Sequence, residues 1–88
     1  MSYEKVAQLK SRVIIGTKQT LKAMKDGEIS EVYLAEDADQ QITQKVQDLA
    51  EALDIPYRRV DSKDKLGNAC GIDVGASTVA IKKDSFGD

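Results

Sequence analysis

The chain has 88 residues, of which 32% are charged and 41% hydrophobic, with a formal net charge of −2. A chain of this length forms one small domain that buries roughly 60–65% of the surface of its unfolded form, which excludes a large enclosed active site. Its apolar content is too high for a disordered protein, and no apolar run approaches the roughly 18 residues of a membrane span.

The charges are unevenly distributed along the chain. Residues 1–26 carry a net charge of +4, residues 27–54 one of −7, residues 55–66 one of +2 and residues 67–88 one of −1. Two basic sections therefore flank an acidic one. If the basic sections meet in space, they form a positive patch on an acidic body, and such patches govern recognition more than the total charge does.

A helix and a short strand are expected at the start of the chain. Ser2 is expected to cap the helix, which buries Val6 and ends near residue 11. The β-branched segment 12–15 then predicts a strand that stops at Gly16.

The second helix is expected over about residues 18–26 and closes at Gly27, a glycine suited to the left-handed position after a helix. Thr17 is expected to cap it, while Leu21 and Met24 pack inward. Its first turn is polar and basic. A helix N-terminus also presents unpaired N–H groups and partial positive charge, so phosphates and the acceptor edges of bases are natural ligands there.

A doubly buried strand and the clearest amphipathic helix follow. Segment 29–36 contains an apolar run, 32–35, that is typical of a strand in the middle of a sheet. Asp39 is then expected to cap a third helix. Apolar residues repeat along that helix with a helical period and are expected to face the core: Ile42, Val46, Leu49, Ala50 and Leu53.

The last third of the chain predicts strand, helix and strand. Pro56 forbids continuation of the third helix and starts a strand over residues 56–60. Ser62 is expected to cap a short fourth helix that ends at Gly71. A final strand is expected over residues 78–82.

This alternation predicts a single α/β domain over residues 1–82, with helices on both faces of a four-stranded, mostly parallel mixed sheet. A flexible polar tail over residues 83–88 is expected to follow. Ligands of such sheets tend to meet the loops at the carboxyl ends of the strands. We expect those loops at residues 16–17, 37–39 and 61–65, with the tail as the fourth.

Little catalytic chemistry is available. Without histidine the chain lacks the usual general base and the commonest metal ligand, and its single cysteine, Cys70, is interpreted as a buried packing thiol. Carboxylates at Glu36, Asp37 and Asp39 could hold a hard cation, but a helix cap and solvated loop charges account for them. We expect no enzyme, no metal and no cofactor. One cysteine also excludes an internal disulfide, so the cytoplasm is the expected compartment.

Two donor-rich segments remain, the helix tip over residues 16–22 and the turn over residues 62–67. Each alone could be a capped helix start with surface charge. Together they point to RNA, with phosphates fixed by Lys18, Lys22, Lys63 and Lys65. Base edges would be read by Thr17 and Gln19. An exposed apolar ledge, against which an unstacked base could pack, would consist of Leu66, Ile72 and Val74.

Three segments, in order and spacing, match a known family: Ile15–Lys22, Leu34–Asp39 and Ser62–Ile72. The chain resembles the kink-turn RNA-binding ribosomal-protein family of archaeal and eukaryotic large subunits, and most closely its small stand-alone bacterial (YbxF-like) members. The similarity covers about residues 3–82. Archaeal members usually carry asparagine and glutamate where this chain has Lys18 and Gln19.

The resemblance implies a non-catalytic protein with a three-layer α/β/α sandwich that binds a sharp RNA bend built on tandem sheared G·A pairs, in ribosomal or regulatory RNA. The helix tip would contact the guanines in the widened groove, and the loop 72–74, with Leu66 nearby, would cover the flipped-out nucleotide. Lys63 and Lys65 would touch the RNA backbone, and Asp39 would approach the extruded base. The expected RNA-binding residues are therefore Gly16, Thr17, Lys18, Gln19, Lys22, Asp39, Lys63, Lys65, Leu66, Ile72 and Val74.

A second interpretation is a protein-interaction module that keeps the fold without specific RNA binding and docks partners on its acidic third helix. An enzyme acting on nucleic acid is a third and weaker one. On the first interpretation we expect a monomer whose partner is kink-turn RNA, with the ribosome as a further candidate partner and no membrane association.

Overall fold

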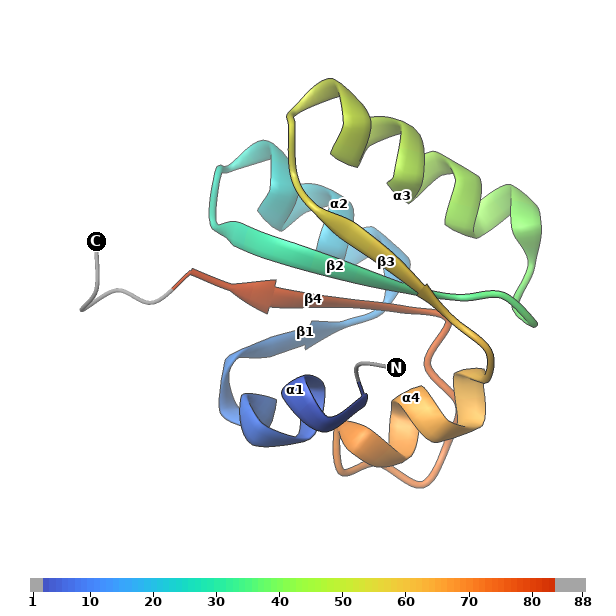
Figure 1. The fold of residues 1–88 in the computed structure, drawn as a ribbon. Coiled ribbons are helices and arrows are strands. Elements are labelled where there is room, and N and C mark those ends of the chain that lie inside the picture. Colours follow the sequence, from blue (N-terminus) through green and yellow to red (C-terminus); the bar gives the residue numbers. More distant parts are fainter. Residues whose placement is uncertain (1–2, 84–88) are drawn as a thin grey trace.

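The computed structural model of the chain describes residues 3–83, which form four α-helices, one 3₁₀ helix and a four-stranded sheet (Figure 1). In chain order the elements are α1 (Tyr3–Gln8), η1 (Lys10–Arg12), β1 (Val13–Ile15), α2 (Thr17–Lys25), β2 (Ile29–Ala35), α3 (Gln40–Ala52), β3 (Tyr57–Val60), α4 (Lys63–Ala69) and β4 (Thr78–Lys82). The predicted cap of the first helix, Ser2, lies outside the described residues. No helix within the described range has the length and apolar character that a bilayer crossing requires.

The four strands lie in the order β1-β4-β2-β3. Strands β2 and β3 are parallel, whereas β4 is antiparallel to both of its neighbours, β1 and β2. The three-layer arrangement with four strands is confirmed, because α2 and α3 cover one face of the sheet and α1 and α4 the other (Figure 1). The expectation of a mostly parallel sheet is wrong, since only one of the three pairings is parallel.

The direction of β4 follows from the connection before it. Helix α4 has seven residues and rises only about 10 Å, and the loop over residues 70–77 then brings the chain back to where the helix began. The backbone N–H of Ala76 donates to the carbonyl of Lys63, the first residue of α4, at 2.9 Å. Strand β4 therefore starts at the edge where β3 ended and must run the other way.

One edge of the sheet consequently gathers the carboxyl ends of β1, β2 and β3 and the amino end of β4, and we call it the loop edge. The C-terminal segment, expected there as a fourth loop, leaves from the opposite edge. Lys82 pairs with Ile29 at the start of β2, and the N–H of Lys83 donates to the carbonyl of Glu28 at 2.8 Å. The rest of the predicted tail lies outside the described residues, and the loop 70–77 takes its expected place.

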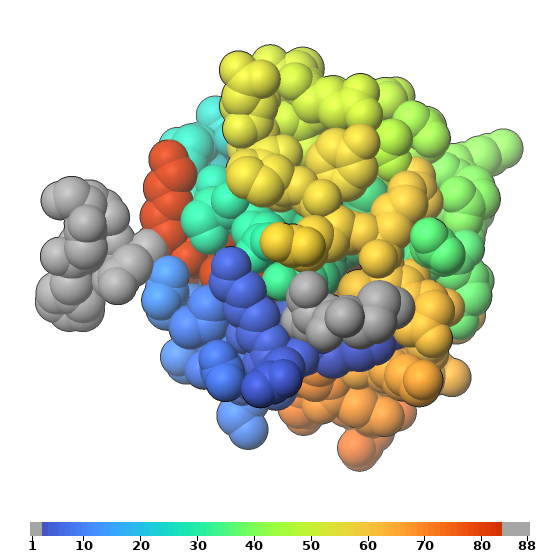
Figure 2. Space-filling view, in the orientation of Figure 1, coloured from blue at the N-terminus to red at the C-terminus, as the bar shows by residue number. Residues whose placement is uncertain are grey.

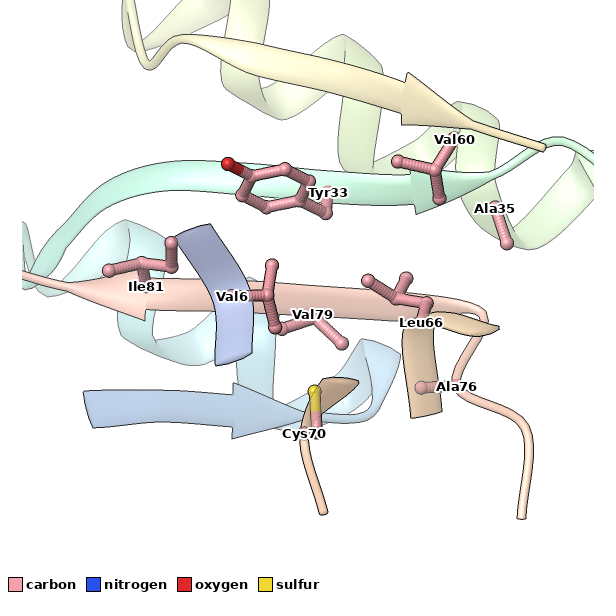
Figure 3. Packing of buried hydrophobic residues seen from close by; sticks show 9 residues of the cluster. All are labelled: Val6, Tyr33, Ala35, Val60, Leu66, Cys70, Ala76, Val79 and Ile81. Atoms are coloured by element: carbon pink, nitrogen blue, oxygen red, sulfur yellow. The ribbon is translucent and has the colours of Figure 1, made fainter. Parts of the chain in front are cut away.

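The two faces of the sheet hold separate clusters of buried side chains. Residues 32–35 of β2 are all 0% exposed, which confirms a central strand buried on both faces. On the side of α2 and α3 the buried residues are Ala23, Met24, Ile29, Val32, Leu34, Val46, Ala50 and Ala80. On the side of α1 and α4 they are Val6, Tyr33, Ala35, Val60, Leu66, Cys70, Ala76, Val79 and Ile81 (Figure 3). Cys70 is free and buried in this cluster, which confirms it as a packing residue, and its burial raises the pKa of the thiol.

Two of the three predicted helix caps in the described range are confirmed. The Asp39 carboxylate accepts from the N–H of Gln41 at 2.9 Å, and the Ser62 hydroxyl accepts from the N–H of Lys65 at 3.2 Å. Such bonds satisfy N–H groups that a helix start leaves unpaired. The third cap, Thr17, is wrong and is described with the site.

The amphipathic helix α3 is confirmed, but its buried stripe is narrower than expected. Thr43, Val46 and Ala50 are each 0% exposed and form the line that faces the sheet. Ile42 and Leu53, expected in the core, are 36% and 44% exposed because they fall at the margins of that line.

Candidate functional site

The loop edge brings together the segments that the sequence placed at strand ends. The N–H of Gly16, after β1, donates to the carbonyl of Thr78, at the start of β4, at 3.0 Å. The Asp37 carboxylate, after β2, accepts from the N–H of Lys63, in the first turn of α4, at 2.8 Å. Figure 2 shows the green loop after β2 beside the orange surface of α4. The helix tip 16–22 and the loop 70–77 therefore lie at the same edge of the sheet.

The N-cap of the helix tip is Gly16 rather than Thr17. Gly16 occupies the N-cap position with φ +106°, and Thr17 is the first helical residue, so the prediction that Thr17 caps the helix is wrong. The Thr17 hydroxyl instead donates to that of Thr78 at 3.2 Å, which ties α2 to β4. Among residues 3–83, no heavy atom other than those of Gly16 and its chain neighbours lies within 4 Å of the position that a Cβ on Gly16 would take, so a ligand can approach the backbone there.

Polar side chains project from the tip into solvent. Lys18, Gln19 and Lys22 are exposed, as predicted, while Met24 is buried and Leu21 half-buried on the inner side. Neither Lys18 nor Lys22 has an ion-pair partner among residues 3–83. Gln19 and Lys22 also line a shallow hollow of about 270 Å³ that runs along α2 toward Asp26 and Glu28. The tip thus offers free cations and amide donors next to an open helix start.

The loop 70–77 presents one apolar side chain to solvent. Val74 is 68% exposed, and Ile72 is half-buried against the core beneath it. The N–H of Ile72 donates to the carbonyl of Gly67 at 3.1 Å, and the loop returns to Lys63 through the bond of Ala76 described above. Helix α4 therefore holds the loop at both of its ends.

Leu66 does not belong to the exposed ledge. Its side chain is 0% exposed and lies in the core between α4 and the sheet (Figure 3). The expectation that it faces the RNA is wrong, because residue 66 falls on the inner side of the short helix that Ser62 caps. Leu66 supports the surface from below, and the exposed apolar part of it is Val74 with the edge of Ile72.

The remaining predicted residues are exposed at the loop edge. Lys63 and Lys65 lie in the first turn of α4, and Asp39 lies at the start of α3 with one carboxylate oxygen engaged in its cap. Lys65 differs from the other cations because its ammonium lies 3.7 Å from a carboxylate oxygen of Asp61.

Carboxylates near the loop edge are used as hydrogen-bond acceptors. Asp37 accepts from the N–H of Lys63 and Asp39 from that of Gln41. Within the part of the chain that the structure describes, no three or more histidine, cysteine, aspartate or glutamate side chains cluster as metal ligands would.

Sequence reasoning missed four residues of this region. Gly67 and Gly75 both make room for close packing between α4 and the loop 70–77. Gly67 lies inside α4, and a glycine within a helical segment is a signal of close packing. The Tyr3 hydroxyl donates a hydrogen bond to the Asp61 carboxylate, 58 residues away in the sequence, and no local pattern predicts such a contact.

These features define a class: a small α/β/α domain whose loop edge combines exposed cations, an open helix start and a projecting apolar side chain. The chain belongs to the ribosomal protein L7Ae/L30e/S12e/Gadd45 family, whose profile matches residues 1–86.

Individual relatives agree with this membership. An RNA-binding protein of Halalkalibacterium halodurans is 55% identical over 83 residues, which cover 94% of this chain and 100% of that protein. The RNA-binding protein YbxF of Geobacillus stearothermophilus is 54% identical over 81 residues, covering 92% of this chain and 98% of that one.

Solved structures share the fold. The Giardia lamblia 15.5 kD RNA-binding protein superimposes with a TM-score of 0.83 at 28% identity, covering 96% of this chain and 70% of that one. A protein of unknown function from Bacillus halodurans gives a TM-score of 0.84 at 24% identity, covering 97% of this chain and 88% of that chain, and its likeness is one of fold.

Proposed function

We propose that this protein binds RNA without catalysis, and that it recognises and stabilises kink-turns in ribosomal or regulatory RNA. The family supports an RNA ligand, because two close relatives and a structural neighbour are RNA-binding proteins. The three segments that resemble the kink-turn-binding family, Ile15–Lys22, Leu34–Asp39 and Ser62–Ile72, all reach the loop edge.

The observation that carries the proposal is the position of the helix tip and Val74 at one edge. A kink-turn offers guanine edges in a widened groove beside an unstacked nucleotide. Lys18 and Lys22 can donate to guanine acceptors and phosphates, and the backbone N–H groups in the first turn of α2, which no side-chain cap at Gly16 engages, add donors of fixed direction. Val74, 68% exposed, can cover an unstacked base, as proteins that read irregular RNA do.

Other cations at the loop edge would hold the RNA backbone. Lys63 and Lys65 stand in the first turn of α4, beside the loop that carries Val74. Phosphate contacts of this kind fix the position of the protein on the RNA, while contacts of the tip to base edges recognise the sequence. Asp39 keeps one carboxylate oxygen free of its cap bond and can accept from an extruded base.

The mechanism is a shift of population. A kink-turn RNA exchanges between open and sharply bent forms, and a protein that binds only the bent form increases its share. The size of the shift is set by the difference in affinity for the two forms. The open form does not place the guanine edges and the unstacked nucleotide side by side. A protein that contacts both at once therefore binds the bent form more tightly than the open one.

The test compares two RNAs that differ only in the tandem G·A pairs. The wild-type protein is titrated with a kink-turn RNA and with the same RNA in which Watson–Crick pairs replace the G·A pairs, at two salt concentrations. We expect tighter binding of the kink-turn, retained at the higher salt. Equal and strongly salt-dependent binding would mean phosphate contact alone and would refute the proposal. No binding to either RNA would favour the protein-interaction module with α3 as its docking face.

A further inference from the structure

The Asp61 carboxylate, at the start of the turn between β3 and α4, is shared between two partners. One oxygen, Oδ1, accepts from the hydroxyl of Tyr3 in α1, and the other, Oδ2, lies 3.7 Å from the ammonium of Lys65 in α4. Lys65 is thereby the one lysine expected at the RNA surface that has an acidic partner within residues 3–83.

Tyr3 holds this arrangement in place from a different part of the chain. Its hydroxyl donates to Asp61 and also accepts from the N–H of Ser62 at 3.0 Å. The hydrogen bond from Tyr3 is the main reason that the pKa of Asp61 lies below its ordinary value. Asp61 is therefore anchored, ionised at neutral pH, and directed at Lys65 before any RNA arrives.

An anchored carboxylate beside a phosphate-binding lysine has a predictable effect. The pair is exposed, with 65% of the Lys65 side chain and 54% of the Asp61 side chain accessible, so the pair itself is weak and does little for stability. A phosphate that approaches Lys65 must nevertheless replace this carboxylate and then lie close to its charge. Both effects weaken RNA binding at Lys65.

We propose that Asp61, positioned by Tyr3, competes with RNA phosphate for Lys65 and so limits the non-specific part of RNA binding. The proposal rests on the proposed function in one respect, namely that Lys65 contacts the RNA backbone. Because non-specific binding consists of phosphate contacts, a lysine that is occupied in the free protein contributes less to it than the free lysines of the helix tip do.

The test is the variant Asp61→Asn, which removes the charge and keeps an oxygen that can accept from Tyr3. We expect it to bind both the kink-turn RNA and the G·A-replaced RNA about two- to fivefold more tightly than wild type, and to show a steeper dependence on salt. In the Lys65→Ala background the same substitution should change RNA affinity by less than about 1.5-fold, because the lysine with which Asp61 pairs is absent.

Asp64→Asn is the matched control, since Asp64 is an exposed acid in the first turn of α4 without an ion-pair partner in the described range. Its effect on affinity should be the same with and without Lys65. Weaker or unchanged binding by Asp61→Asn, or a gain that persists without Lys65, would overturn the competition.

The outcome separates this inference from the proposed function. If wild type binds both RNAs equally, kink-turn recognition fails while the coupling of Asp61 to Lys65 can still be measured on either RNA. If wild type prefers the kink-turn but the coupling is absent, only the competition fails. If no RNA binds, both fail.

Tyr3→Phe supplies a readout without RNA: the pKa of the Asp61 carboxyl, followed by NMR, should rise toward its ordinary value, and an unchanged pKa would show that Tyr3 does not position it.

Discussion

The carbonyl oxygen of Val74 occupies the space that a side chain at position 67 would need. A Cβ on Gly67 would overlap that oxygen and would lie 3.2 Å from the Cα of Gly75. Across the same contact, a Cβ on Gly75 would lie 3.0 Å from a carboxylate oxygen of Asp64. The backbone of the loop 70–77 therefore packs directly on α4, and this contact holds the exposed Val74 side chain in its position.

Gly67→Ala should move the loop away from α4. The overlap is with backbone atoms, which cannot rotate aside, so we expect the free energy of unfolding to fall by about 1–3 kcal/mol. Affinity for kink-turn RNA should fall as well, because Val74 is displaced. Chemical denaturation and RNA titration measure the two effects, and Asn68→Ala, an exposed change on the same helix, is the control. Wild-type stability and affinity in Gly67→Ala would show that the contact is not required.

Lys22→Ala should weaken binding to kink-turn RNA by about 1–3 kcal/mol, because a lysine at a guanine edge contributes that much to base recognition. The matched control is Lys25→Ala, which removes the same charge from the last turn of the same helix, at the opposite end from the loop edge. Isothermal titration gives both values. Equal losses in the two variants would indicate a general effect of charge rather than a contact at the tip.

Val74→Ala should reduce RNA affinity without reducing stability. The side chain is 68% exposed, so its truncation leaves the core intact, while lost burial against a base should weaken binding about three- to tenfold. Leu53→Ala, which truncates an exposed apolar residue at the far end of α3, should leave affinity unchanged. Unchanged binding by Val74→Ala would remove the loop from the proposed interface.

Glu31 is a buried acid that links three elements. Its carboxylate lies 2.8 Å from the ammonium of Lys5 in α1 and 3.0 Å from Nε of Arg58 in β3, with the Tyr33 hydroxyl at 3.4 Å. Burial raises the pKa of Glu31, but the hydrogen bonds and charges of Lys5 and Arg58 together outweigh burial, and the pKa lies below its ordinary value of 4.5.

A lowered pKa in the folded protein means that ionised Glu31 stabilises the fold above pH 4.5, and that this stabilisation is lost as the pH falls through the folded-state pKa. Glu31→Gln should therefore lower the free energy of unfolding by about 1–2 kcal/mol at pH 7. The difference from wild type should shrink below pH 4.5. Denaturation curves at pH 7 and pH 3 test this, and a difference that does not depend on pH would contradict it.

Much of this fold could be predicted because the signals are local. The apolar run 32–35 is enough to identify a central strand. Asp39 and Ser62 stand directly before their helices, and their side-chain oxygens accept from the unpaired N–H groups of the first turn. The exposed lysines of the helix tip were also predicted, since residues 18 and 22 share one face of a helix.

The errors concern relationships across the chain. The direction of β4 depends on the return of the loop 70–77 to the start of α4, and the spacing of apolar residues along the sequence does not indicate this return. Gly16 rather than Thr17 occupies the N-cap position of α2, and the Thr17 hydroxyl bonds to that of Thr78 rather than to an N–H of its own helix. Leu66 was expected in the exposed ledge, but its face of α4 packs on the sheet, and this long-range contact buries it.

The most direct test of the proposed interface is residue-by-residue mapping of the RNA contact by NMR. Backbone amide signals of the labelled protein are followed during addition of a kink-turn RNA, with the G·A-replaced RNA as reference. We expect the largest shifts specific to the kink-turn in residues 16–22 and 71–77, with smaller ones in residues 61–65. Shifts concentrated on the outer face of α3 or on β3, with residues 16–22 unaffected, would contradict it.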